Sequence, residues 1–226
     1  MKLNRKYLSI SVIAIFVFVS VFMAANLEAQ GLDTVIGETG VSLNAERQHV
    51  RTQETNLGNL VTDIIRWRTG ADIAVYNGGG IRASADLGEI TLEEAIEIMA
   101  FDNEVVTLEM SGLEIIEMLE HGVSEYPAVA GKFLQVSGMR FYFNPDEEPG
   151  HRVKDVFIGG ERLRIRGNYE VATNGFLASG GDDYTMLGEA DQLMTFGTRD
   201  QAMFIEYIQE NSPIFPVVEG RIVVTD

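Results

Sequence analysis

The sequence of 226 residues is 46% hydrophobic and has 34 acidic against 17 basic residues, a formal net charge of -17. Such a chain can bury a sizeable core, in one large or two small domains. Its acidity argues against binding of nucleic-acid polymers, which requires clustered Lys and Arg, but is compatible with one small anionic ligand held by local arginines. Cysteine is absent, which excludes a disulfide framework and a thiolate metal site.

The N-terminus has the composition of a targeting segment. Lys2, Arg5 and Lys6 precede an almost wholly apolar run, residues 7–25, and small residues follow it. We expect residues 1–29 to be a signal peptide and the protein to be exported to the periplasm or the extracellular space. The apolar run is also long enough to span a bilayer if it is not cleaved, so a membrane-anchored form stays open.

The first elements after this segment are a hairpin and an amphipathic helix. The runs 32–39 and 41–43 predict a short hairpin that turns at its glycines. Apolar residues then recur at helical spacing over 57–65, which predicts a helix capped by Thr55 or Asn56 and ended by a glycine.

The next stretch joins a buried strand to a glycine-rich turn. Residues 73–76 are apolar and predict a core strand, and Asn77 and three glycines, residues 78–80, follow it before Arg82. Glycines allow positive φ or the close approach of a ligand, and an arginine fork suits phosphate or carboxylate. From spacing alone, a tight loop with a solvated arginine is an equally good interpretation.

The rest of the chain intermixes helices and strands. Residues 90–99, 111–122 and 199–211 predict helices, the first two with Thr91 and Ser111 as caps. Strands are predicted over 104–110, 133–136, 139–143, 153–158, 163–165 and 220–224, and the segment 169–174 leads into a loop over 175–183. We therefore predict one α+β domain, residues 32–226, with a mixed sheet and flanking helices.

Five separated stretches together resemble the C-terminal domain of the 5′-nucleotidase family. They are Arg51-x-x-Glu54-x-Asn56-Leu-Gly58-Asn59, Asn77-Gly-Gly-Gly-Ile-Arg82, Phe101-Asp-Asn, Gly131-Lys-Phe-Leu-Gln-Val-Ser-Gly-Met and Asn174-Gly-Phe-Leu-Ala-Ser-Gly-Gly-Asp182. One of these motifs alone would be weak, but five in the same order are specific. The resemblance runs from about residue 32 to the end of the chain.

The resemblance implies a domain that binds the substrate's nucleoside. It implies that two phenylalanines sandwich the base, that two arginines reach ribose and phosphate oxygens, that an asparagine contacts the nucleoside and that an aspartate accepts from ribose hydroxyls. The substrate-binding residues implied in this chain are Arg51, Asn77, Gly79, Arg82, Phe101, Phe176 and Asp182. Without the resemblance, each phenylalanine would be assigned to the core.

The chain departs from the family pattern in its catalytic part. Family enzymes carry an N-terminal metallophosphatase domain with two metal ions on Asp-x-His and Gly-Asn-His motifs. The three histidines here, His49, His121 and His151, lack such spacing, and we interpret His121 as a capped helix end. We therefore predict no catalytic residue, metal ligand or cofactor in this chain, and expect divalent metals only on a separate metallophosphatase chain.

Three hypotheses follow. The first is a nucleoside- or nucleotide-binding domain that takes part in nucleotide hydrolysis with a separate metallophosphatase chain. The second is an autonomous hydrolase with a metal on Asp182 and Asp183, which ranks low because adjacent carboxylates on a strand point in opposite directions. The third is a non-catalytic exported interaction protein. Base stacking tolerates any base, so the sequence selects no particular nucleoside.

Overall fold

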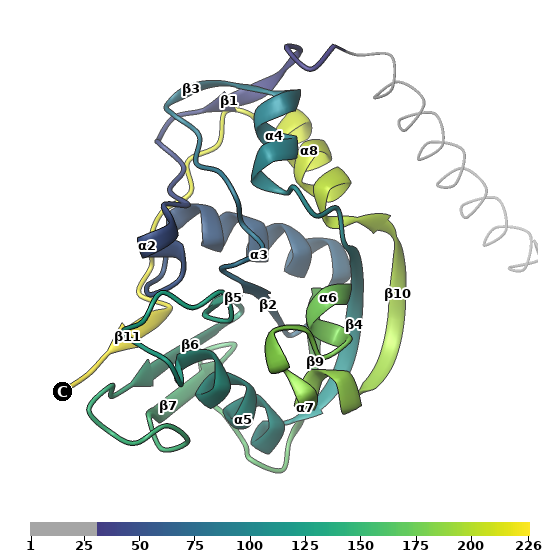
Figure 1. Ribbon diagram of the computed structural model, residues 1–226. Helices are drawn as coiled ribbons and strands as arrows, with labels where there is room; N and C mark the ends of the chain where they lie inside the picture. Colours follow the sequence, from purple (N-terminus) through teal and green to yellow (C-terminus); the bar gives the residue numbers. More distant parts are fainter. Residues whose placement is uncertain (1–30) are drawn as a thin grey trace, which may run out of the picture. The chain divides into compact units, whose positions relative to one another are not determined.

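The computed structural model describes residues 31–226, so the predicted signal peptide, residues 1–29, lies outside the described residues. The chain divides into Met1–Thr34 and Val35–Asp226, and every element below belongs to the second unit (Figure 1). Within residues 31–226, no helix combines the length and apolar character needed to cross a membrane.

Helices and strands alternate irregularly along this unit. The helices are α2 (Arg47–Val50), α3 (Asn56–Thr69), α4 (Leu92–Ile98), α5 (Gly112–Val123), α6 (Gly175–Ala178), the 3₁₀ turn η1 (Gly181–Asp183), α7 (Thr185–Glu189) and α8 (Asp200–Asn211). The strands are β1 (Val35–Thr39), β2 (Ile73–Asn77), β3 (Gly88–Thr91), β4 (Glu104–Ser111), β5 (Leu134–Ser137), β6 (Met139–Phe143), β7 (Val153–Ile158), β8 (Glu161–Arg162), β9 (Asn168–Asn174), β10 (Asp191–Arg199) and β11 (Ile222–Val224).

The strands of the described residues form three sheets. The central sheet has the order β10-β4-β9-β2-β5, in which β2 and β9 are parallel and the other pairs are antiparallel. A second sheet has the order β11-β6-β7-β8, with β11 parallel to β6, and β1 pairs with β3. The predicted α+β class with a mixed sheet and flanking helices is confirmed.

Helix α3 shows how local sequence and tertiary packing agree. Its apolar stripe is buried against β2 and β5, beside the sheet in Figure 1, and each fully buried Leu or Ile contributes about 1.5–3 kcal/mol. Thr55 is its N-cap and accepts a hydrogen bond from the Gly58 N–H, while Gly70 ends it with a φ of 74°.

The predicted caps of α4 and α5 are also confirmed. Thr91 and Ser111 each accept from the N–H of a glutamate three residues on, and each glutamate side chain accepts from the cap's own N–H. These reciprocal capping boxes satisfy donors that the first helical turn leaves unpaired.

Several sequence-based assignments were wrong or missed. The predicted hairpin does not form, because β1 pairs with β3 and Leu43 bridges to Ala85. Strand β8 lies at Glu161–Arg162 instead of 163–165. Strand β10 was missed because its residues are almost all exposed, so they lack the alternation of apolar and polar residues that marks a half-buried strand.

The central sheet brings distant segments to one edge. Because β2 and β9 are parallel, their last residues, Asn77 and Asn174, lie at the same end of the sheet. Strand β4 pairs Val105 with Asn174, and β5 pairs Leu134 with Asn77, both antiparallel. The segments that precede β4 and β5 therefore reach this edge too.

A buried carboxylate fixes one of these segments. Asp200 accepts hydrogen bonds from the Tyr76 hydroxyl (2.7 Å), the Asn103 N–H (2.9 Å), the Asn103 amide (3.1 Å) and the Gln201 N–H (2.7 Å). Burial raises the pKa of Asp200 above its ordinary value of 3.8, and these hydrogen bonds oppose the shift. Asp200 thus holds the residues just before β4 against the core.

The raised pKa predicts how stability varies with pH. The folded chain binds the Asp200 proton more tightly than the unfolded chain, so the contribution of Asp200 to the free energy of unfolding is fully present below pH 3.8 and decreases as pH rises through the raised pKa. We predict that the difference in free energy of unfolding between wild type and Asp200→Asn, measured by urea denaturation, decreases with rising pH and then levels off. A difference that grows with pH would contradict this assignment.

Candidate functional site

A cavity of about 270 Å³ lies at the edge of the central sheet described above. Its walls come from the end of β2 and the turn after it, from the segments before β4 and β5, from α6, and from the turns at α2 and η1. The lining residues are Arg51, Asn77, Gly79, Gly80, Phe101, Asn103, Gly131, Phe176 and Asp182. The structure therefore brings all the predicted site residues except Arg82 onto one cavity, and Arg82 lies beside it.

A directional chain of hydrogen bonds organises this cavity. The Leu177 N–H donates to Asn174 Oδ1 (2.9 Å), Asn174 Nδ2 donates to Asn77 Oδ1 (3.2 Å), and Asn77 Nδ2 donates to Asp182 Oδ2 (2.9 Å). A backbone N–H at one end and a carboxylate at the other fix both amide orientations. Asn174 and Asn77 are almost completely buried, so an unpaired amide at either position would be costly.

Asp182 lies in a turn with an uncommon backbone conformation. Asp182 and Asp183 have φ values of 53° and 64°, in the left-handed region that Asp tolerates better than most residues. The two carboxylates are thus in a 3₁₀ turn, and the assumption that they alternate on a strand is wrong.

The His121 side chain makes a hydrogen bond with the backbone of this turn. Its Nε2 lies 2.8 Å from the Asp182 carbonyl oxygen, which can only accept, so Nε2 carries the proton. The imidazole also packs edge-on against the buried Tyr184 ring, with 4.6 Å between centroids. His121 also lies in the last turn of α5, where the N–H of the C-cap residue Ser124 donates to the His121 carbonyl oxygen, so the predicted capped helix end is confirmed, and its side chain in addition reaches the turn.

The glycine-rich turn after β2 is shaped by contacts with the rest of the chain. The Gly78 and Gly79 N–H groups donate to the Phe133 and Gly131 carbonyls at 2.7 and 2.8 Å. A Cβ at Gly78 would lie 2.1 Å from the Val50 carbonyl oxygen. Neither glycine has a positive φ, so glycine is needed here for close approach of backbone to backbone.

Two phenylalanines lie on the cavity with large exposed areas. Phe101, after α4, is 59% exposed, and Phe176, in the single turn of α6, is 45% exposed. A Cβ at Gly181 would lie 2.6 Å from the Phe176 ring, so this glycine makes room for it. The two exposed aromatic rings provide faces for a planar ligand on this cavity.

Two arginines give the cavity positive charge. Arg51 is 8% exposed, and its buried Nε has no hydrogen-bond partner in the described structure. Burial lowers the pKa of Arg51, the charges of Arg47 and Arg82 lower it further, and Asp182 opposes the shift. Arg82 is exposed, donates to the Gly79 carbonyl (3.1 Å) and lies 5.5 Å from the Phe101 ring centroid.

Sequence reasoning missed four residues that shape the site. Asn103, Gly80 and Gly131 line the cavity, and His121 holds the turn that carries Asp182. Asn103 and Gly131 lie within two of the five motifs that carry the family resemblance, so these motifs could have indicated them as site residues. The role of His121 depends on a tertiary contact across 61 residues, which no local pattern reports.

Over residues 31–226, no three or more His, Asp or Glu side chains gather closely enough to hold a metal ion. The side chains of this part of the chain therefore do not fit the donor set of a two-metal phosphatase centre, and no catalytic step is assigned to them. The arrangement instead combines two aromatic faces, a fixed carboxylate and two cations, which suits a planar ligand bearing hydroxyls and negative charge.

Comparisons with known proteins identify the relatives of this arrangement. Residues 35–189 match the family described as 5′-nucleotidase, C-terminal domain. The chain is 41% identical to the trifunctional nucleotide phosphoesterase YfkN of Bacillus subtilis over 197 residues, 83% of this chain and 14% of that protein. It is 34% identical to UshA of Escherichia coli, over 81% of this chain and 32% of that protein.

A solved structure of a 5′-nucleotidase precursor is also similar to this chain. The 5′-nucleotidase precursor of Thermus thermophilus superposes with a TM-score of 0.83 and 38% identity, over 93% of this chain and 43% of that one. The chain thus spans less than half the length of each of these relatives. From the family match and these identities, the chain belongs to the 5′-nucleotidase C-terminal domain family.

Proposed function

We propose that this chain is an exported nucleoside- or nucleotide-binding domain that holds the substrate of a 5′-nucleotidase reaction. The observation that carries the proposal is the pair of exposed rings, Phe101 and Phe176, on the cavity that also holds Asp182. The relatives named nucleotide phosphoesterase and 5′-nucleotidase precursor support the ligand class.

In this proposal the base stacks between Phe101 and Phe176. Stacking on an aromatic ring contributes about 1–3 kcal/mol per base and tolerates every base. The ribose hydroxyls donate to Asp182, whose Oδ2 is engaged by Asn77 while Oδ1 accepts no hydrogen bond from residues 31–226. The carboxylate is thus oriented by the protein and keeps one oxygen for a ligand.

The two arginines hold the anionic end of the ligand. The partnerless Arg51 Nε and the positive charge of Arg82 favour a phosphate or a ribose oxygen in the cavity, because charged donors form the stronger hydrogen bonds. The Gly79 backbone lines the same cavity and packs closely against Gly131, so it forms part of the ligand's surroundings. Binding of a nucleotide would also relieve the mutual repulsion of the two guanidinium groups.

Hydrolysis itself is assigned in this proposal to a metallophosphatase partner that carries the divalent metals. The proposal rests on the absence of a metal-binding group among residues 31–226 together with the family membership. Export is supported by the composition of residues 1–29 and by the relative described as a precursor. No binding of nucleic-acid polymers is proposed, given the net charge of -17.

The stacking role predicts a specific loss of affinity. Phe176→Ala in the full chain should weaken adenosine and AMP binding by about 5- to 150-fold, because it removes one stacking face. Isothermal titration calorimetry measures this, and Phe215→Ala is the matched control, since Phe215 is 63% exposed and lies outside the cavity. Equal dissociation constants for wild type and Phe176→Ala would contradict the stacking role.

The partner role predicts a gain in hydrolysis. Adding the full chain to a purified, metal-loaded metallophosphatase chain should increase phosphate release from AMP, and the Phe176→Ala chain should increase it less. Phosphate release over time measures the effect. If the rate is the same with and without the chain, the partner role is wrong, while the calorimetric result still decides nucleoside binding.

A further inference from the structure

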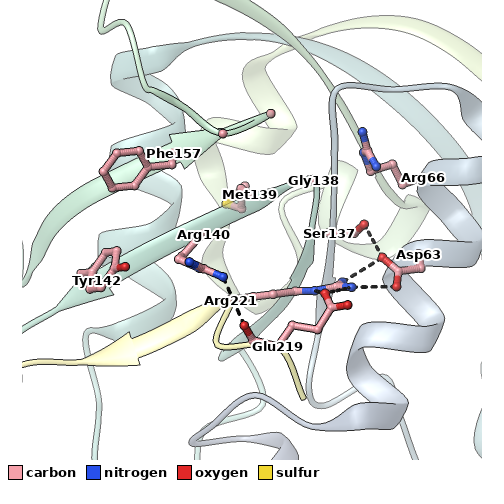
Figure 2. Close-up of a pocket in the computed structure, with 12 residues that line it drawn as sticks. Asp63, Arg66, Ser137, Gly138, Met139, Arg140, Tyr142, Phe157, Glu219 and Arg221 are labelled. Atoms are coloured by element: carbon pink, nitrogen blue, oxygen red, sulfur yellow. Dashed lines mark hydrogen bonds and ion pairs between the residues drawn. The ribbon is translucent and has the colours of Figure 1, made fainter. Parts of the chain in front are cut away.

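A second and larger cavity, of about 520 Å³, lies between α3 and the outer face of the sheet β11-β6-β7-β8 (Figure 2). The residues that matter for its chemistry are Asp63, Arg66, Arg140, Tyr142, Phe157 and Arg221. It shares no lining residue with the nucleoside cavity, so it needs an explanation of its own.

The sheet presents an aromatic pair and an arginine to this cavity. Along β6 the side chains of Met139, Phe141 and Phe143 are buried, so Arg140 and Tyr142 lie on the opposite face. Phe157 of β7 is the cross-strand partner of Arg140 and therefore shares that face. The Tyr142 and Phe157 rings meet edge-on with 6.2 Å between centroids, as Figure 2 shows at one side of the cavity.

The charged side chains at the floor of the cavity already form ion pairs with one another. Arg221 donates to both oxygens of Asp63 at 2.8 Å and pairs with Glu219 at 2.7 Å, and the Ser137 hydroxyl also donates to Asp63 (Figure 2). These groups satisfy one another, so a ligand gains little by contacting them.

Arg66 and Arg140 are different, because no carboxylate of residues 31–226 lies within 4.0 Å of either guanidinium. Arg66 donates through Nε to the Asp72 carbonyl (2.9 Å), and Arg140 donates to the Glu219 carbonyl (3.2 Å). One carbonyl orients each guanidinium and leaves its other N–H donors for a ligand.

Gly138 keeps Arg66 in this position. Its φ is 75°, and a Cβ there would lie 2.5 Å from Arg66 Nε and 2.3 Å from the Asp72 carbonyl oxygen. Glycine at the β5–β6 turn thus allows Arg66 to lie across the backbone at the cavity wall. Two carbonyl-anchored cations beside one cavity stand out in a chain with a net charge of -17.

We propose that this cavity is a second ligand site, which binds a phosphate monoester attached to a planar ring. The two charges of Arg66 and Arg140 match the dianionic phosphate, and arginine forks suit phosphate oxygens. The Tyr142–Phe157 pair provides an apolar face for the ring. The proposal is independent of the nucleoside site, and nucleotides and other aryl phosphates share this chemistry.

The test uses phenyl phosphate as the probe and the full chain carrying Phe176→Ala, which weakens the first site. Calorimetric titration should show saturable binding that is about ten-fold weaker when Arg140→Gln or Arg66→Gln is added, because each removes a charged donor. Arg166→Gln is the matched control, since Arg166 is exposed and outside both cavities, and it should leave the affinity unchanged. Arg140 is exposed on a strand, so its variant retains the fold even if Arg66→Gln unfolds the chain.

Two further measurements test the role of the aromatic pair and the identity of the phosphate ligand separately. Inorganic phosphate should bind more weakly than phenyl phosphate, and Phe157→Ala should remove that advantage. Competition by AMP identifies a nucleotide as the source of the phosphate, and its absence identifies another aryl phosphate. No saturable binding at millimolar phenyl phosphate, or equal affinities in Arg140→Gln and Arg166→Gln, would overturn the proposal, whatever adenosine does at the first site.

Discussion

The hydrogen-bond chain from the Leu177 N–H through Asn174 and Asn77 to Asp182 is the constraint on which the proposed nucleoside site depends. Two parallel neighbouring strands end in these asparagines, so the sheet itself places the two amides side by side. The chain joins α6, which carries Phe176, to the turn that carries Asp182. A stacking face and a hydroxyl acceptor are therefore positioned by one buried polar network, in which each amide is oriented by its neighbours.

The same sheet edge explains why the site combines rigidity with exposure. Asp200 fixes Asn103 from the core side, while Phe101, two residues earlier, remains 59% exposed. In the proposed function, this exposed ring beside an anchored segment is one of the two faces on which the base stacks. In the second cavity, too, the fold orients exposed side chains. Gly138 and two backbone carbonyls position arginines that have no ion-pair partner among residues 31–226.

Sequence reasoning was most successful where the determinants are local. The caps at Thr55, Thr91 and Ser111 follow from patterns of three or four residues, and they are confirmed. The family resemblance brought together residues that the fold places on one cavity, although their roles in binding stay predictions. The pairing of β1 with β3, the contact of His121 with Asp182 and the approach of Gly78 to Val50 could not be predicted, because each depends on segments far apart in sequence.

The most direct test of the account is a crystal structure of the chain with adenosine. We predict that the base lies between the Phe101 and Phe176 rings and that a ribose hydroxyl donates to Asp182, with the Asn174–Asn77–Asp182 hydrogen bonds intact. Adenosine bound elsewhere, or bound in this cavity with its base away from both rings, would contradict the central claim that this sheet edge is a nucleoside site.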